Sequence, residues 1–153
     1  GRIFLKIAVR RLIHDSLYSG SREHVCDGGS GVEGIGRPRV EPSFVPTVID
    51  RMIRVPNVAS YAAIHFLESV LGRRCGGSTG TNLFGAFTLM NEMRQNGQGG
   101  SIVTLICDDG NRYANTYFNH DWLRANGYDI APWLVAYERF FEHGQWILPT
   151  SAN

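Results

Sequence analysis

The turn Gly76–Thr81, with the sequence GGSTGT, is the segment whose residue types point most directly to ligand binding. Consecutive glycines allow the backbone to approach a ligand closely, and the free N–H groups at the start of a following helix attract a polar or anionic group. Ser78 and Thr79 add two hydroxyls. The residues alone leave two interpretations open: a cradle for a phosphate or heterocycle, and a tight helix-entry turn capped by Ser or Thr.

Two common nucleotide-binding motifs do not fit this turn. A P-loop requires a lysine directly after its second conserved glycine, whereas Thr81 follows Gly80 here. A Rossmann fingerprint requires glycines spaced GxGxxG directly after a strand, and this spacing is absent. A ligand at this turn is therefore not expected to be held in either of these two ways.

Other polar residues give weaker signals. The pair Asp108–Asp109 could bind Mg²⁺, but a paired acid at the end of a strand is more often a solvated turn. The five histidines lack metal-ligand spacing, and Cys26, Cys75 and Cys107 form no CxxC pair, so neither a metal site nor a disulfide framework is predicted. Cys75 and Cys107 are expected to be buried as small apolar side chains, in a chain working in the reducing cytoplasm.

Composition limits the partners of the chain. Its 153 residues suffice for one domain, and the net charge of +1 does not favour nucleic acid or an anionic membrane. The apolar run Ser101–Cys107 is far shorter than the roughly 20 residues that a membrane helix needs. Lys6 is the single lysine, which matters for any chemistry that needs a reactive amine.

Three helices and one buried strand are expected to position these residues. The helix Asn57–Leu71 is predicted with Asn57 as its cap and Gly72 as its end. Apolar spacing predicts two further helices over about 81–96 and 116–126, and the aromatic tail up to Trp146 fits one more. Ile102–Cys107 has the composition of a strand covered on both faces. Its order among the helices predicts an α/β fold whose neighbouring strands lie outside this chain.

Five segments in order then resemble the pyridoxal-phosphate enzymes of the cysteine synthase and cystathionine β-synthase family. The resemblance spans about residues 32–127, and its motifs are Glu33–Gly36 (EGIG), Pro46–Asp50, Gly76–Gly80, Ile102–Cys107 and Asp108–Tyr113. It implies the C-terminal half of a tryptophan synthase β-like (fold-type II) enzyme, with helices on a partial parallel sheet. Residues 1–31 would be a divergent or unrelated leader, residues 32–127 part of the large domain, and residues 128–153 a helical tail.

The resemblance also implies site residues. Ser78 would form a hydrogen bond with the pyridine nitrogen of pyridoxal 5'-phosphate, while Gly34, Ile35 and Gly36 would line the substrate cleft through their backbone. The Schiff-base lysine of the family has no counterpart, because Lys6 lies in a stretch that matches no family motif. No catalytic residue and no metal ligand is therefore assigned in this chain.

The resemblance implies a reaction at the β-carbon of cysteine- or serine-type amino acids. Three alternatives remain open: β-replacement of the cysteine synthase kind, β-elimination by a desulfhydrase-type lyase, and a truncated remnant that is inactive because it lacks the lysine. The expected partners are a small amino-acid substrate and, in the complete enzyme, a second subunit of a homodimer.

Overall fold

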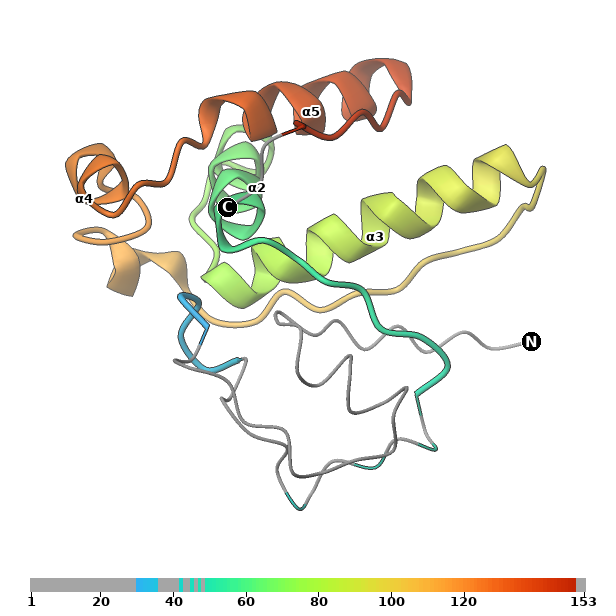
Figure 1. The fold of residues 1–153 in the computed structure, drawn as a ribbon, viewed down its shortest axis with the longest axis horizontal. Helices are drawn as coiled ribbons and strands as arrows, with labels where there is room; N and C mark the ends of the chain where they lie inside the picture. Colours follow the sequence, from blue (N-terminus) through green and yellow to red (C-terminus); the bar gives the residue numbers. More distant parts are fainter. Residues whose placement is uncertain (1–29, 36–41, 43–44, 46, 48, 151–153) are drawn as a thin grey trace.

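The structure is a computed structural model that describes residues 30–35, 42, 45, 47 and 49–150. Its helical elements follow the order α2 (Asn57–Leu71), α3 (Gly77–Gln95), the 3₁₀ helix η2 (Gly110–Tyr113), α4 (His120–Ala125) and α5 (Ala131–His143). In Figure 1, α2 lies at the centre, α5 crosses above it and α3 extends to one side. The central helix α2 packs against both α3 and α5, so it organises the core.

Helix α2 has the bounds that the sequence predicts. Gly72 ends it with φ of 66° and donates its N–H to the Glu68 carbonyl, as a C-terminal glycine commonly does. The prediction that Asn57 caps the helix is wrong, because Pro56 occupies the cap position and no side chain caps the helix. The Asn57 side chain instead accepts a hydrogen bond of 3.4 Å from the Ser30 hydroxyl.

Helix α3 begins four residues earlier than its apolar pattern predicts. The turn residues Gly77, Ser78, Thr79 and Gly80 form its first turn, with Gly76 as the residue before it. These residues have a weak intrinsic preference for helix, so the early start reflects tertiary packing rather than local propensity. The consequence is that Ser78 lies at the N-terminus of a helix of 19 residues and not in a free loop.

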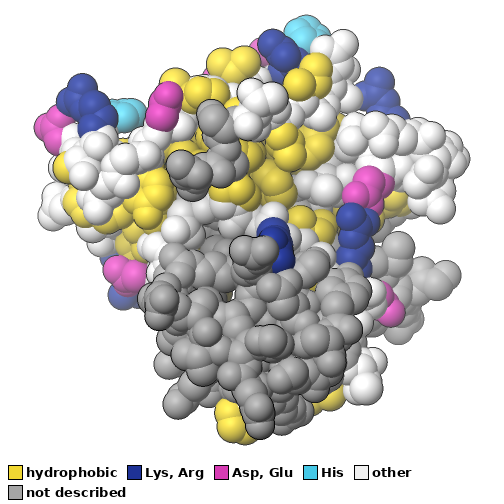
Figure 2. Space-filling view, viewed as in Figure 1, with side chains coloured by type: hydrophobic (Ala, Val, Ile, Leu, Met, Phe, Trp, Pro, Cys, Tyr) yellow, Lys and Arg dark blue, Asp and Glu magenta, His cyan; other side chains and the backbone are white. Residues whose placement is uncertain are grey.

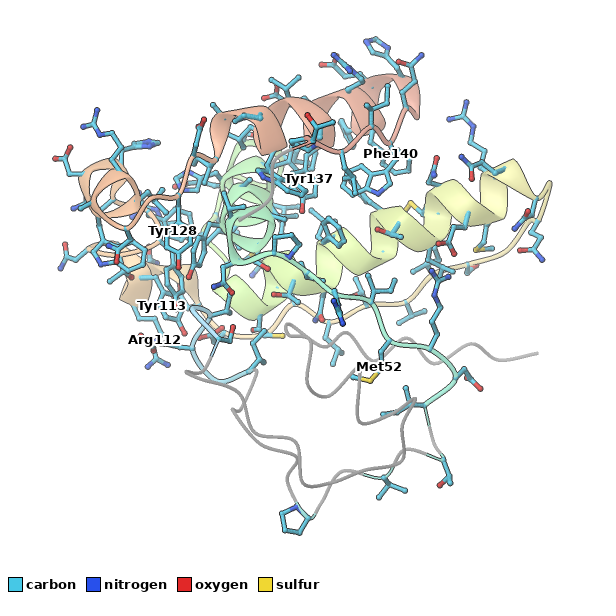
Figure 3. The ribbon with its side chains drawn as sticks, viewed as in Figure 1. Met52, Arg112, Tyr113, Tyr128, Tyr137 and Phe140 are labelled. Carbon is cyan, nitrogen blue, oxygen red and sulfur yellow. The ribbon has the colours of Figure 1, made fainter. Side chains whose placement is uncertain are left out.

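An aromatic core fills the space between α2, α3 and α5. Tyr137 of α5 is fully buried, and its hydroxyl donates a hydrogen bond of 2.9 Å to the Ala59 carbonyl of α2. Burial raises its pKa well above the usual tyrosine value, so the hydroxyl stays protonated. Figure 3 shows Tyr137 and Phe140 pointing from α5 toward the other two helices. Trp146 closes this core with its ring centroid 5.5 Å from that of Phe84.

The third predicted helix is shorter than expected. Within 116–126 the chain forms a turn and then the short helix α4, while η2 lies before this range. Asn119 explains where α4 starts, because its side chain accepts hydrogen bonds from the backbone N–H groups of Asp121 and Trp122. Leu123 is buried and Trp122 partly buried, as the apolar pattern predicts.

The predicted sheet is not confirmed. Among the described residues no β-strand is present, and the one bridge that joins two of them pairs Cys75 with Asp109. Residues 102–107 are extended but not covered on both faces, since the Val103 side chain is 92% exposed. In Figure 1 this segment runs back beside α3. The prediction that residues 102–107 form a buried strand is therefore wrong in this structure.

The distribution of charged side chains on the surface agrees with the net charge of +1. On the face shown in Figure 2, basic and acidic side chains lie scattered around hydrophobic ones over the helical part of the chain. Among the described residues, no helix is both long enough and apolar enough to cross a membrane.

Candidate functional site

Three glycines hold the N-terminus of α3 against three different segments. A Cβ atom on Gly80 would lie 2.1 Å from the Ser60 carbonyl oxygen of α2, and one on Gly76 would lie 1.8 Å from Asp108 Oδ1. A Cβ atom on Gly77 would lie 2.9 Å from Val32 Cγ1. Real Cβ atoms do not approach a backbone atom so closely, so close packing requires Gly80 whether or not a ligand binds, whereas Gly76 and Gly77 face side chains.

Ser78 differs from its neighbours in having an uncommitted hydroxyl. It is half-buried, and its hydroxyl forms no hydrogen bond with the described residues. The Thr79 hydroxyl, in contrast, accepts a bond of 2.9 Å from the backbone N–H of Cys107. The Thr81 hydroxyl donates to the Gly77 carbonyl and lies 2.7 Å from the Ser60 hydroxyl. Of the three hydroxyls in this turn, the one at position 78 is thus available to a ligand.

The second predicted element, the EGIG segment, lies beside this turn. Val32 is 1% exposed and packs on Gly77. Gly34 has φ of 80°, a conformation that favours glycine. Apart from its chain neighbours, no described residue lies within 4 Å of the position that a Cβ atom would take there. Ile35 is partly buried against the core. Gly36, also predicted to line the cleft, falls outside the described residues.

Tyr117, which no sequence pattern marked as a site residue, ties these elements together. The Tyr117 hydroxyl accepts a hydrogen bond of 2.9 Å from the Glu33 N–H and donates one of 3.0 Å to the Gly31 carbonyl. Its ring stacks on Tyr113 at 4.7 Å and on Tyr61 at 4.6 Å between centroids. The spacing of four residues between Tyr113 and Tyr117 was a usable signal, because such a spacing places two rings on the same side of a helical turn.

The acidic pair has structural partners. Asp108 accepts a hydrogen bond of 2.7 Å from the Tyr113 hydroxyl, and burial together with this bond raises the pKa of Tyr113 to about 12. The guanidinium nitrogens of Arg112 lie 3.8 Å from a carboxylate oxygen of Asp108 and 3.9 Å from one of Glu33. Arg112 therefore links the EGIG segment to the acidic turn. Figure 3 shows Arg112 and Tyr113 at this corner of the molecule. Asp109 accepts a bond from the Asn111 N–H and thereby caps η2.

Neither the acids nor the cysteines form a metal centre in the part of the chain that is described, where no three His, Cys, Asp or Glu side chains come together suitably. Cys75 is buried as predicted, and burial raises the pKa of its thiol. The matching prediction for Cys107 is wrong, because this side chain is exposed. A hollow of about 410 Å³ adjoins both cysteines and the acidic pair, but Ser78 does not line it.

The described residues therefore offer features that suit one wall of a ligand site, and together they do not form a complete catalytic centre. These features are a helix N-terminus with a free hydroxyl at Ser78 and a glycine loop that Tyr117 and Arg112 hold in place. Such a wall can orient a ligand, but the described residues supply no reactive amine, because the single lysine, Lys6, is not among them.

Known proteins of one family are similar to this chain in sequence. No protein-family model matches the chain. The chain is 52% identical over 127 residues to the L-cysteine desulfhydrase Cds1 of Mycobacterium tuberculosis, which covers 83% of this chain and 34% of that protein. It is 27% identical over 131 residues to cysteine synthase 1 of Emericella nidulans, covering 83% of this chain and 35% of that protein. It is 28% identical over 97 residues to the cystathionine β-synthase of Dictyostelium discoideum, covering 63% of this chain and 19% of that protein.

These relatives are pyridoxal-phosphate-dependent enzymes. The chain is a homologue of the C-terminal half of enzymes in the cysteine synthase and cystathionine β-synthase family, which confirms the resemblance drawn from its motifs. It spans about a third of the length of the first curated relatives that it matches.

Proposed function

We propose that this chain forms the ring-facing part of a pyridoxal-phosphate-dependent enzyme that acts at the β-carbon of cysteine- or serine-type amino acids. The observation that carries the proposal is the free hydroxyl of Ser78 at the N-terminus of α3. The residues present fit the ring side of this cofactor, because a half-buried hydroxyl with no protein partner is available to a pyridine nitrogen.

A serine at position 78 suits reactions at the β-carbon of the substrate. When bound, pyridoxal phosphate supplies an electron sink for the substrate's reacting carbon. A neutral hydroxyl at Ser78 does not force the ring nitrogen to carry a proton, as a carboxylate would. The ring would then withdraw electrons from the substrate only moderately. This favours elimination or replacement at the β-carbon over transamination.

The loop beside Ser78 would position the substrate. Gly34 and Ile35, with Gly36, would line the cleft through their backbone groups. Tyr117 would fix this loop through its two hydrogen bonds, and Arg112 would strengthen it through Glu33. These residues orient and shape the cleft, and none of them moves a proton in the proposed reaction.

Between elimination and replacement, we favour elimination from cysteine with release of sulfide. The support is the degree of identity, which is 52% with a cysteine desulfhydrase and 27% with a cysteine synthase over similar lengths. We also propose that the complete enzyme is a homodimer and works in the cytoplasm, as the family resemblance implies.

A second proposal concerns the chain by itself. Its single lysine, Lys6, matches no family motif, and a covalent cofactor lysine must be desolvated and well placed. We therefore propose that the isolated chain is catalytically inactive and that activity requires the rest of the enzyme.

A chimeric enzyme tests the main proposal. Residues 32–127 of this chain would replace the aligned residues of the Mycobacterium tuberculosis relative, and visible cofactor absorbance and sulfide release from L-cysteine would be measured. We expect both signals from the chimera and no sulfide from the isolated chain mixed with pyridoxal phosphate. Cysteine formation from a serine-type substrate and added sulfide, without sulfide release from L-cysteine, would favour replacement. A chimera that folds but shows no cofactor absorbance would refute the proposal.

Within the chimera, Ser78→Asp tests the proposed contact. A carboxylate should draw a proton onto the ring nitrogen, change the cofactor spectrum and lower the rate of sulfide release at least tenfold. Ser69→Asp, at an exposed serine near the C-terminus of α2, is the matched control and should leave both unchanged. An unchanged spectrum and rate in the Ser78 variant would remove this serine from the site.

A further inference from the structure

Helix α2 carries a buried tyrosine whose hydroxyl has no protein partner. Tyr61 is fully buried, and its hydroxyl forms no hydrogen bond with any residue that the structure describes. Burial, followed by the nearby Tyr128 and Tyr117, raises the pKa of Tyr61 above the usual tyrosine value, so the hydroxyl keeps its proton. A buried hydroxyl without a partner destabilises a fold, and a phenylalanine would avoid this loss. The hydroxyl at position 61 therefore has a reason other than the stability of the core.

This hydroxyl lies against the backbone of Gly31, two residues before the EGIG segment. A Cβ atom on Gly31 would lie 2.7 Å from the Tyr61 hydroxyl oxygen and 2.7 Å from Asn57 Nδ2. Asn57 and Tyr61 are four residues apart in α2 and so share one face of the helix. Gly31 is not among the glycines with positive φ, so space and not backbone conformation requires a glycine here.

The two side chains of α2 that face this glycine differ in their freedom to move. The Tyr61 ring is stacked on Tyr117 with 4.6 Å between centroids and packs edge-on against Tyr128 at 4.9 Å. Asn57 is only partly buried, and its side chain has one printed hydrogen bond, of 3.4 Å, from the Ser30 hydroxyl. The Tyr61 hydroxyl is therefore a fixed stop for the loop, whereas the Asn57 side chain can adjust.

The same glycine is held from a second direction by Tyr117. The Tyr117 hydroxyl donates to the Gly31 carbonyl at 3.0 Å and accepts from the Glu33 N–H at 2.9 Å. These bonds draw the loop inward, and the Tyr61 hydroxyl limits how closely it can approach α2. Because Gly34 directly follows Glu33, the position of Gly31 determines where the EGIG segment begins.

We infer that Tyr61 is a positioning residue for the substrate, acting through Gly31. Its hydroxyl and the Asn57 side chain form a seat that fixes how far the EGIG segment stands from α2. The inference rests on the proposed function, in which the backbone of this segment lines the cleft for a small amino acid, and it deepens that proposal by naming what sets the position of the cleft wall. The seat touches no reacting atom, so it should affect substrate binding and not the chemical step.

A pair of Tyr→Phe variants tests this role in the chimeric enzyme, extended to residues 30–143 of this chain. Tyr61→Phe removes the stop but no hydrogen bond, so we expect the KM for L-cysteine to rise at least threefold. The kcat, the cofactor absorbance and the unfolding midpoint should not fall. Tyr137→Phe, which removes the bond to the Ala59 carbonyl, should lower the midpoint and leave the KM unchanged.

A substitution at Gly31 and its rescue test the contact directly. Gly31→Ala places a methyl group against the Tyr61 hydroxyl, so the KM for L-cysteine should rise at least tenfold. Adding Tyr61→Phe removes the oxygen that the methyl group would strike, and Asn57 can move aside. The double variant should therefore have a KM within threefold of that of Tyr61→Phe alone. Gly99→Ala, at an open position, is the control and should leave the KM unchanged.

Hydrogen exchange in the whole chain without cofactor gives a second measurement. The Glu33 amide should exchange at least tenfold faster in Gly31→Ala, and the added Tyr61→Phe should reverse most of this change. A chimera without cofactor absorbance would refute the proposed function, whereas this exchange pattern would still show the seat. An unchanged KM in Tyr61→Phe, a midpoint lowered as in Tyr137→Phe, or no rescue of Gly31→Ala would each overturn the inference.

Discussion

The hydroxyl of Tyr117 accepts a hydrogen bond of 2.9 Å from the backbone N–H of Glu33, although 84 positions separate the two residues in the sequence. This bond, with the one from the same hydroxyl to the Gly31 carbonyl, fastens the glycine loop beside the N-terminus of α3. Two segments that the sequence marks as parts of one site are thus joined by a residue that carries no such mark.

Replacing Tyr117 by Phe should loosen this loop while leaving the aromatic stack intact. The ring still packs on Tyr61 and Tyr113, but the Glu33 N–H and the Gly31 carbonyl lose their partner. We expect the free energy of unfolding to fall by about 1–2 kcal/mol. Hydrogen exchange should accelerate at Glu33 and remain unchanged in α5. Uniform acceleration in both places would contradict a local role.

The uncommitted hydroxyl of Ser78 predicts a contrast with Thr79. Ser78→Ala should change the free energy of unfolding by less than about 0.5 kcal/mol, since no protein partner is lost. Thr79→Val has nearly the same shape as the native side chain but leaves the Cys107 N–H without its acceptor, at a cost of about 1 kcal/mol. Urea unfolding of both variants measures the difference. A large loss from Ser78→Ala would mean that this hydroxyl has a structural partner.

The contact between Gly80 and α2 predicts a severe packing defect on substitution. In Gly80→Ala the new methyl group would fall 2.1 Å from the Ser60 carbonyl, so α2 and α3 would have to separate. We expect a loss of about 3 kcal/mol or more, at the upper end for overpacked cores. Gly99→Ala is the control, because apart from its chain neighbours none of the described residues lies within 4 Å of its Cβ position. Equal stability of the two variants in thermal unfolding would show that the helices can adjust.

Acid should destabilise the chain through His65. Burial lowers the pKa of this imidazole, an effect only partly offset by its 2.8 Å hydrogen bond to the Tyr117 carbonyl, while His120 and Arg74 lower it further and Glu68 raises it. The folded chain therefore binds this proton less readily than the unfolded chain, whose histidine titrates near pH 6.5.

The sign of the effect follows from this difference. The contribution of His65 to stability is complete above about pH 6.5 and is lost as the pH falls below that value, because the unfolded chain then takes up more protons. Urea midpoints at pH 7, 6 and 5 should decrease in that order. His65→Gln, which can still donate to the Tyr117 carbonyl, should reduce the slope, and an identical slope in the variant would exclude His65 as the cause.

The sequence was informative where local rules and local spacing suffice. The bounds of α2 follow from apolar periodicity and from Gly72, and the segments EGIG and GGSTG identify the family through their order along the chain. It was misleading where packing overrides propensity: α3 starts at Gly77 because close contacts with Ser60 and Val32 hold its first turn. The exposure of Cys107 could not be predicted either, because it depends on what covers residues 102–107.

The sequence by itself determined the family and the residue types of the turn at Ser78, since both are properties of order and spacing along the chain. Only the tertiary structure decided which hydroxyl of that turn is free, because Thr79 and Thr81 find their partners on segments far away in sequence. It also decided that residues 101–107 are uncovered. Burial is a property of the whole assembly of segments around a residue, and no local pattern can state whether those segments are present.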